Sequence, residues 1–189
     1  GWSMGPLADN AETKAMLKEF LGDEAASVKW TTLGEYLEFL EKQGVSPNVA
    51  SFVGATTLRI HEIGFDNRPP TDAELQNMKT LTHQAMQEGA MGLGSSLIYP
   101  PAFFAKTEEL VELAKVVGEY NGMYISHMRS EGNRIEESVQ ELITIAREGG
   151  VSAEIYHLKM AGQQNWGKLA AVVKLIEDAS SKYFVGQVT

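Results

Sequence analysis

The chain has 189 residues, 43% of them hydrophobic, which is enough to bury the core of one domain or of a large part of a bigger one. Its 25 acidic and 16 basic residues give a net charge of −9 without any basic cluster, which argues against nucleic acid or an anionic membrane as partner. No segment approaches the roughly 20 apolar residues that cross a bilayer. Because cysteine is absent, a metal would have to be held by histidine and oxygen ligands.

The N-terminal part has a helical pattern and leads into a series of alternating strands and helices. We expect a helical lead-in over residues 1–49 and strand-helix repeats over residues 50–189, all within a single domain portion. The predicted strands are residues 50–60, 90–97, 123–127, 153–157 and 183–189. Four helical stripes of apolar residues separate them. This order predicts an α/β fold with a parallel sheet, either doubly wound or closed as a barrel.

Two of the predicted helices carry capping signals. Thr71 with Glu74 forms a capping box at the start of the first helix between the strands, and Asn133 with Glu136 is expected to cap the third. The chain does not begin with methionine, and its first residues are typical of a loop. We therefore expect a fragment of a longer protein.

A repeated phrase is the strongest functional signal. Residues 123–129 form a short apolar segment that ends in His127 and then Arg129, and residues 153–159 repeat this pattern with His157 and Lys159. One strand-helix-strand unit takes about 30 residues, so the two histidines are expected at matching positions on neighbouring parallel strands. Sites of α/β enzymes lie at the carboxyl ends of such strands. The pair therefore predicts half of a metal site.

Four phrases together resemble the N-acyl-D-amino-acid deacylases, or D-aminoacylases, of the amidohydrolase superfamily. They are residues 51–54, 88–101, 124–132 and 155–159, and they keep the order and spacing of the family. The resemblance implies a partial (β/α) barrel of the metal-dependent hydrolase type, about strands 3 to 7 of 8. It also implies that the family's His-x-His motif and its bridging ligand precede Gly1, and that its catalytic aspartate follows Thr189. The isolated piece is accordingly expected to be inactive.

The family pattern implies a role for each of several residues. His127 and His157 would be zinc ligands, Lys159 would bind the α-carboxylate of the substrate, and Tyr99 would act at the scissile carbonyl as a catalytic and substrate-binding residue. Arg129 is a further substrate-binding candidate. The alternative for Arg129 is a structural role, in an ion pair with Glu131 that orients the loop.

Other chemically suggestive residues are expected to be structural. His61 follows the first predicted strand in a loop, and His83 falls on a predicted helix, so neither has the context of a ligand. The stretch with Gly92, Gly94 and Ser95 lacks the ending of a phosphate loop, and close backbone packing near a site is the better interpretation.

Two alternatives to a deacylase remain open. A cyclic-amide hydrolase similar to dihydroorotase or hydantoinase would use a carboxylated lysine from the fourth strand, but residues 90–97 contain no lysine. A non-catalytic ligand-binding or assembly module could retain the same scaffold. For the deacylase, we expect a small N-acyl amino acid as substrate, one or two zinc ions in the complete enzyme, and a cytoplasmic location. For the isolated piece, we expect self-association through exposed barrel edges and weak or absent zinc binding.

Overall fold

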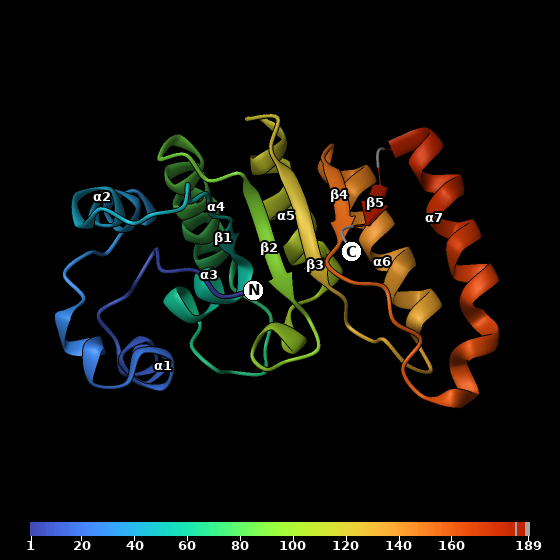
Figure 1. Cartoon of the computed structure of the whole chain (residues 1–189), viewed down its shortest axis with the longest axis horizontal. Coiled ribbons are helices and arrows are strands. Elements are labelled where there is room, and N and C mark those ends of the chain that lie inside the picture. The colour runs from blue at the N-terminus through green and yellow to red at the C-terminus, as the bar shows by residue number, and fades with distance from the viewer. Residues whose placement is uncertain (184, 188–189) are drawn as a thin grey trace.

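The computed structural model describes residues 1–183 and 185–187, and its centre is a five-stranded parallel sheet (Figure 1). The strands are β1 (Val53–Gly54), β2 (Gly92–Ser96), β3 (Met123–His127), β4 (Ser152–Ile155) and β5 (Val185–Gln187). Each pairs in parallel with the next strand along the chain. The predicted parallel α/β architecture is confirmed. Residues 184, 188 and 189 of the last predicted strand lie outside the described residues.

Helices connect the strands and cover one face of the sheet. They are α3 (Ala55–Glu62), α4 (Asp72–Gln87), α5 (Thr107–Gly118), α6 (Ile135–Gly149) and α7 (Leu169–Tyr183), with short 3-10 turns η2 (Ala102–Phe104) and η3 (Gln163–Lys168). In Figure 1, α4, α5 and α6 lie behind the sheet. No helix among the described residues is long and apolar enough to cross a membrane.

The main core fills the space between the sheet and these helices. Strand residues that alternate along the chain enter it, because successive side chains of a strand point to opposite faces. These residues are Leu93, Tyr124, Ala153 and Ile155, and they belong to one cluster with Leu110, Leu113, Ile135, Val139 and Leu142. The sheet is thereby fixed to α5 and α6 by apolar burial.

The N-terminal lead-in is helical and has its own small core. It contains α1 (Ala11–Leu21), the 3-10 turn η1 (Gly22–Ser27) and α2 (Leu33–Gln43). Leu7, Met16, Leu17 and Trp30 form its buried cluster. A capping box of Thr32 and Glu35 begins α2, and Gly44 ends it in the left-handed conformation.

The prediction of a first strand over residues 50–60 is mostly wrong. Only Val53 and Gly54 are β-structure, and the chain then turns directly into α3. Residues 55–60 are all buried, so no alternation of polar and apolar positions distinguishes a strand from a helix. The threonines and isoleucine favour a strand locally, but tertiary packing overrides that preference. His61 consequently lies on α3 and not in a loop.

The capping predictions have different outcomes. Thr71 and Glu74 form the expected capping box of α4. Helix α6, by contrast, begins after Arg134, which makes no side-chain cap, and Asn133 is not its cap. The oxygen of the Asn133 amide instead accepts a hydrogen bond from Asn165 Nδ2 at 3.1 Å. The side-chain oxygen that the local pattern assigned to the start of α6 therefore makes a tertiary hydrogen bond.

Gly92 allows β2 to approach β3 closely. A Cβ atom at this position would lie 1.9 Å from the carbonyl oxygen of Met123, and the backbone has a φ of +154°. Side chains cannot occupy that space, and L-residues rarely adopt that conformation. Close backbone packing in this glycine-containing stretch is therefore present, but at the start of the strand pair and not, as expected, near the end that carries His127.

A buried ion pair ties α3 to α5. Arg59 Nη1 donates to Glu109 Oε2 at 2.7 Å, and both side chains are almost completely inaccessible to solvent. Arg59 Nη2 also donates to the carbonyl oxygens of Asp66 and Arg68. Burial raises the pKa of Glu109, while the neighbouring Arg59 acts in the opposite direction. The Arg59 guanidinium thus binds the Glu109 carboxylate and also the backbone of the segment that follows α3.

This pair leads to a stability prediction. Glu109→Gln should lower the free energy of unfolding by about 3 kcal/mol, because it leaves the buried Arg59 charge without its counter-charge. The measurement is urea denaturation followed by circular dichroism. Glu38→Gln is the control, because Glu38 forms an exposed pair with Lys42 and its loss should cost less than about 0.5 kcal/mol. Equal losses of unfolding free energy in the two variants would show that the Arg59–Glu109 pair does not contribute more than an exposed pair.

Candidate metal centre

The two histidines of the repeated phrase lie at the same edge of the sheet, at the carboxyl ends of β3 and β4. His127 is the last residue of β3, and His157 follows the end of β4 by two residues. In the strand register, Ser126 is opposite Ile155, which places Tyr156 level with His127. The predicted matching positions are therefore offset by one residue. The chain leaves the sheet at this point, and the imidazole of His157 meets that of His127.

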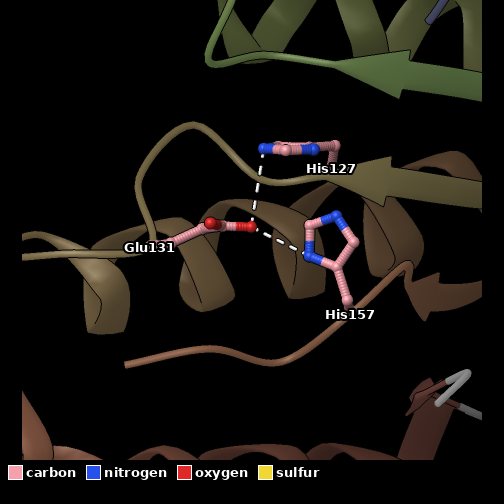
Figure 2. A group of neighbouring side chains, drawn as sticks. All are labelled: His127, Glu131 and His157. Atoms are coloured by element: carbon pink, nitrogen blue, oxygen red, sulfur yellow. Dashed lines mark ion pairs between the residues drawn. The ribbon is translucent and has the colours of Figure 1, made fainter. Parts of the chain in front are cut away.

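Glu131 joins the two histidines (Figure 2). The imidazole rings meet edge to face, with centroids 4.5 Å apart and an interplanar angle of 90°. The carboxylate of Glu131, on the loop after β3, faces both rings. Its Oε1 atom lies 2.9 Å from His157 Nδ1 and 3.5 Å from His127 Nε2.

These three facing atoms have no other polar partner among the described residues. His127 Nε2, Glu131 Oε1 and His157 Nδ1 are buried, yet none of them makes a hydrogen bond. Buried polar atoms normally have such a partner. The three atoms lie within 4.8 Å of one another, and two imidazole nitrogens with one carboxylate oxygen are donors that zinc accepts. The arrangement fits a metal ion bound between them.

The pKa of His127 is lowered from its ordinary value. Burial of the ring is the largest cause, the negative charge of Glu131 opposes it, and His157 and Lys159 add to the lowering. The neutral form of the imidazole is therefore favoured at neutral pH. Only this form has a free lone pair for a metal ion.

Lys159 lies beside this centre and contacts the other oxygen of the same carboxylate. Its Nζ atom is 3.0 Å from Glu131 Oε2, and 52% of its side chain is exposed to solvent. The structure thus brings Lys159 together with the two histidines. The ammonium is positioned to meet an anionic ligand that approaches the histidine pair from solvent.

Tyr99 lies in the turn after β2, next to the first histidine. Its ring centroid is 5.3 Å from that of His127, and the side chain is 57% exposed. The phenol therefore belongs to the same edge of the sheet as the histidines. Its role at a scissile carbonyl stays a prediction.

Arg129 has a different environment from the one expected. Its Nε and Nη2 atoms each donate to the carboxylate of Glu141 at 2.9 Å, and the guanidinium also donates to the carbonyl oxygens of Phe103 and Ala105. The predicted pair with Glu131 is therefore wrong. Arg129 fastens the loop after β3 to the loop before α5, and direct contact with substrate stays a prediction.

Glu131 is the member of the site that sequence reasoning missed. It follows His127 by four residues, but on a loop this spacing does not indicate the direction of the side chain. The nearby Arg129 offered an apparent partner. Glu154, which lies three residues before His157, is a second acidic residue close to the histidines in the sequence, so sequence distance alone does not single out Glu131.

The loops that carry Glu131 and Lys159 are held together by hydrogen bonds. The backbone nitrogen of Ala161 donates to the carbonyl oxygen of Glu131 at 2.7 Å. Asn165 is only 2% exposed, and its Nδ2 atom donates to Ala161 O at 2.7 Å and to Asn133 Oδ1 at 3.1 Å. The two loops therefore form one hydrogen-bonded unit behind the site.

The other two histidines lie away from this centre. His61 Nδ1 is 2.8 Å from Glu62 Oε1, and His83 Nδ1 is 3.1 Å from the hydroxyl of Tyr120. His83 lies on α4, as predicted. Among the described residues, neither belongs to a group of three side chains that could hold a metal.

Comparison with known proteins identifies the family. The chain is 36% identical to the D-aminoacylase of Alcaligenes xylosoxydans xylosoxydans over 182 residues, which cover 96% of this chain and 37% of that protein. It is 32% identical to the N-acyl-D-glutamate deacylase of the same organism, over 92% of this chain and 34% of the relative. The chain belongs to the D-aminoacylase family. It spans about a third of the length of these curated relatives. No family model matches it.

Solved structures of D-aminoacylase relatives have the same fold. A D-aminoacylase crystal structure superposes with a TM-score of 0.86 at 33% identity, and the match covers 98% of this chain and 38% of that one. An N-acyl-D-glutamate deacylase from Bordetella bronchiseptica has a TM-score of 0.78 at 32% identity, with 82% of this chain and 33% of that chain covered. That protein was crystallised with zinc and a phosphonate inhibitor that mimics the tetrahedral intermediate of its reaction.

The lowered pKa of His127 can be tested in this member of the D-aminoacylase family, prepared without metal. We expect its NMR titration midpoint to lie below the ordinary value of about 6.5, because burial disfavours the imidazolium. Since the unfolded chain binds this proton more tightly, the group's contribution to the free energy of unfolding should increase as pH rises from the folded pKa to about 6.5. Glu131→Gln should lower the midpoint further. A midpoint at or above 6.5 in the unsubstituted chain would contradict the prediction.

Proposed function

We propose that this chain is part of a metal-dependent amide hydrolase that removes the acyl group from N-acyl-D-amino acids. One observation carries the proposal: two histidine nitrogens and a carboxylate oxygen converge, buried and without hydrogen bonds, at the carboxyl ends of β3 and β4. The family relationship supports the choice of reaction, because the matched relatives are named for deacylation of D-amino acid derivatives. The reaction is the proposed activity of the complete protein that contains this sequence.

In this proposal, zinc is held by His127, His157 and Glu131. The donor set favours zinc over magnesium or calcium, which prefer oxygen ligands alone. A bound zinc ion acts as a Lewis acid toward a carbonyl oxygen and lowers the pKa of a coordinated water to about 7. The protein contributes neutral imidazoles for this purpose, because burial keeps His127 from taking a proton.

Two further residues would bind the substrate. Lys159 provides an accessible ammonium beside the histidine pair, suited to the α-carboxylate of an N-acyl amino acid. Tyr99 provides a phenol next to His127, where it could donate a hydrogen bond to the oxygen that becomes negative as the amide is attacked. Arg129 supports the site indirectly in this scheme, by fixing the loop that begins after His127.

The scaffold of this site would be a (β/α)8 barrel, of which β1 to β5 are strands 3 to 7. Strand order that follows the chain supports this, since doubly wound sheets reverse their order at a switch point. Helices α4 to α6 also lie on the same face of the sheet (Figure 1). Self-association through open barrel edges, inactivity of the isolated piece and a cytoplasmic location stay predictions.

A cyclic-amide hydrolase is the second candidate, and one feature argues against it. Strand β2, the fourth strand in this scheme, consists of glycine, leucine and serine and offers no lysine for carboxylation. The three buried donor atoms, which make no hydrogen bonds, disfavour a scaffold that binds no ligand, because burial of such atoms costs stability unless a ligand satisfies them.

The metal ligands can be tested by substitution in the complete protein. His127→Ala and His157→Ala should each lower the zinc content measured by metal analysis, and each should lower deacylase activity more than about 100-fold, because each removes a nitrogen donor. His83→Ala is the matched control and should retain zinc and activity. Wild-type zinc content and rate in both site variants would show that the assignment is wrong.

Recognition of the substrate carboxylate can be tested at Lys159. Lys159→Met should reduce kcat/KM for an N-acyl-D-amino acid. The loss should correspond to about 2 to 3 kcal/mol of transition-state stabilisation, the scale of a charge-assisted hydrogen bond, with little change in Tm. The carboxyl-amidated form of the same substrate is the control. It should be affected much less, and an equal loss on both substrates would mean that Lys159 does not bind the carboxylate.

A further inference from the structure

Glu131 has two oxygen atoms with different neighbours. Oε1 faces the two histidine nitrogens (Figure 2). Oε2 lies 3.0 Å from Lys159 Nζ. The side chain of Glu131 is 11% exposed, whereas that of Lys159 is 52% exposed. The better buried carboxylate of this ion pair therefore limits the position of the more exposed ammonium.

The backbone of Glu131 is also fixed relative to the lysine loop. Its carbonyl oxygen accepts a hydrogen bond from Ala161 N, two residues beyond Lys159, and the buried Asn165 ties Ala161 to Asn133. Both the main chain and the side chain of Glu131 therefore contact the segment that carries the ammonium. A lysine has a long flexible side chain, and it loses much rotational freedom when a ligand fixes it. A partner that orients it beforehand reduces that cost.

We propose that Glu131 is a positioning residue that holds the Lys159 ammonium beside the metal centre for recognition of the substrate carboxylate. The proposal rests on the proposed function. An ammonium group has three N–H donors, so one can remain on Glu131 Oε2 while the others meet a ligand. One carboxylate then sets the distance between the metal centre and the group that binds the acid end of the substrate.

A double-mutant cycle in the complete protein tests this role. Glu131→Gln should raise KM for an N-acyl-D-amino acid about tenfold, because a neutral amide holds the ammonium less firmly. Because the proposed function also makes Glu131 a zinc ligand, kcat should fall on both substrates, and the positioning role is the difference in KM: KM should rise about tenfold more for the free acid than for the carboxyl-amidated substrate. In a Lys159→Met background, Glu131→Gln should cause no further increase in KM for the free acid. Glu137→Gln is the matched control, since Glu137 pairs with Arg134 on the exposed surface.

Two measurements independent of activity accompany the cycle. Chelator competition gives the zinc dissociation constant of each variant, and crystal structures of the zinc-loaded wild type and Glu131→Gln locate Lys159 Nζ. We expect the Lys159–Glu131 contact in the wild type and a displaced or disordered ammonium in the variant. A wild-type structure without that contact would overturn the proposal, even if the protein is an active deacylase.

Other outcomes also decide the matter. If Glu131→Gln weakens zinc binding and impairs both substrates equally, Glu131 acts only as a metal ligand and the positioning role is wrong. Additive effects of Glu131→Gln and Lys159→Met on KM would likewise overturn it. If the wild type neither hydrolyses nor binds N-acyl-D-amino acids, the proposed function fails, whereas the crystallographic comparison still decides whether Glu131 holds Lys159.

Discussion

Parallel pairing of β3 with β4 is the constraint on which the rest of the site depends. It brings His127 and His157, which are far apart in the sequence, to one edge of the sheet with their rings in contact. Backbone hydrogen bonds of the ladder set this approach, and apolar packing of α5 and α6 behind the strands keeps the ladder in place. The polar site is therefore supported by a part of the molecule that contains few polar side chains.

The loops add what the strands cannot provide. A strand end delivers a side chain to an edge, but Glu131 and Lys159 lie on irregular segments that need their own restraints. Arg129 binds Glu141 and two carbonyl oxygens on one side of the site, and Asn165 joins the two loops on the other. Each restraint satisfies polar groups of the backbone or of side chains, so the loops are held without a hydrophobic core of their own.

Sequence reasoning succeeded where a local pattern and the tertiary structure agree. Thr71 and Glu74 satisfy each other across one helical turn, and the apolar stripes of α4 to α6 face the sheet, so capping and periodicity indicated these helices correctly. The repeated phrase also indicated the two histidines, because a strand-helix repeat fixes where each strand ends. These features depend on contacts within a few residues or within one repeated unit.

Predictions failed where a distant partner decided the outcome. Because residues 55–60 are all buried, no exposed polar face indicated α3, and the side chain of Asn133 bonds Asn165 and does not cap the start of α6. Arg129 and Glu131, close in sequence, pair with different groups because their side chains leave the loop in different directions. No spacing rule for a loop contains that information.

The close approach of β2 and β3 at Gly92 links the packing of the sheet to the position of His127. The absence of one methyl group at the start of the strand pair lets β3 lie against β2, and β3 delivers His127 at its other end. An alanine at position 92 would place its Cβ atom against the backbone of Met123, so that the start of β2 or of β3 would have to shift. The position of His127 at one end of β3 therefore depends on a glycine that does not contact it, at the other end of the strand pair.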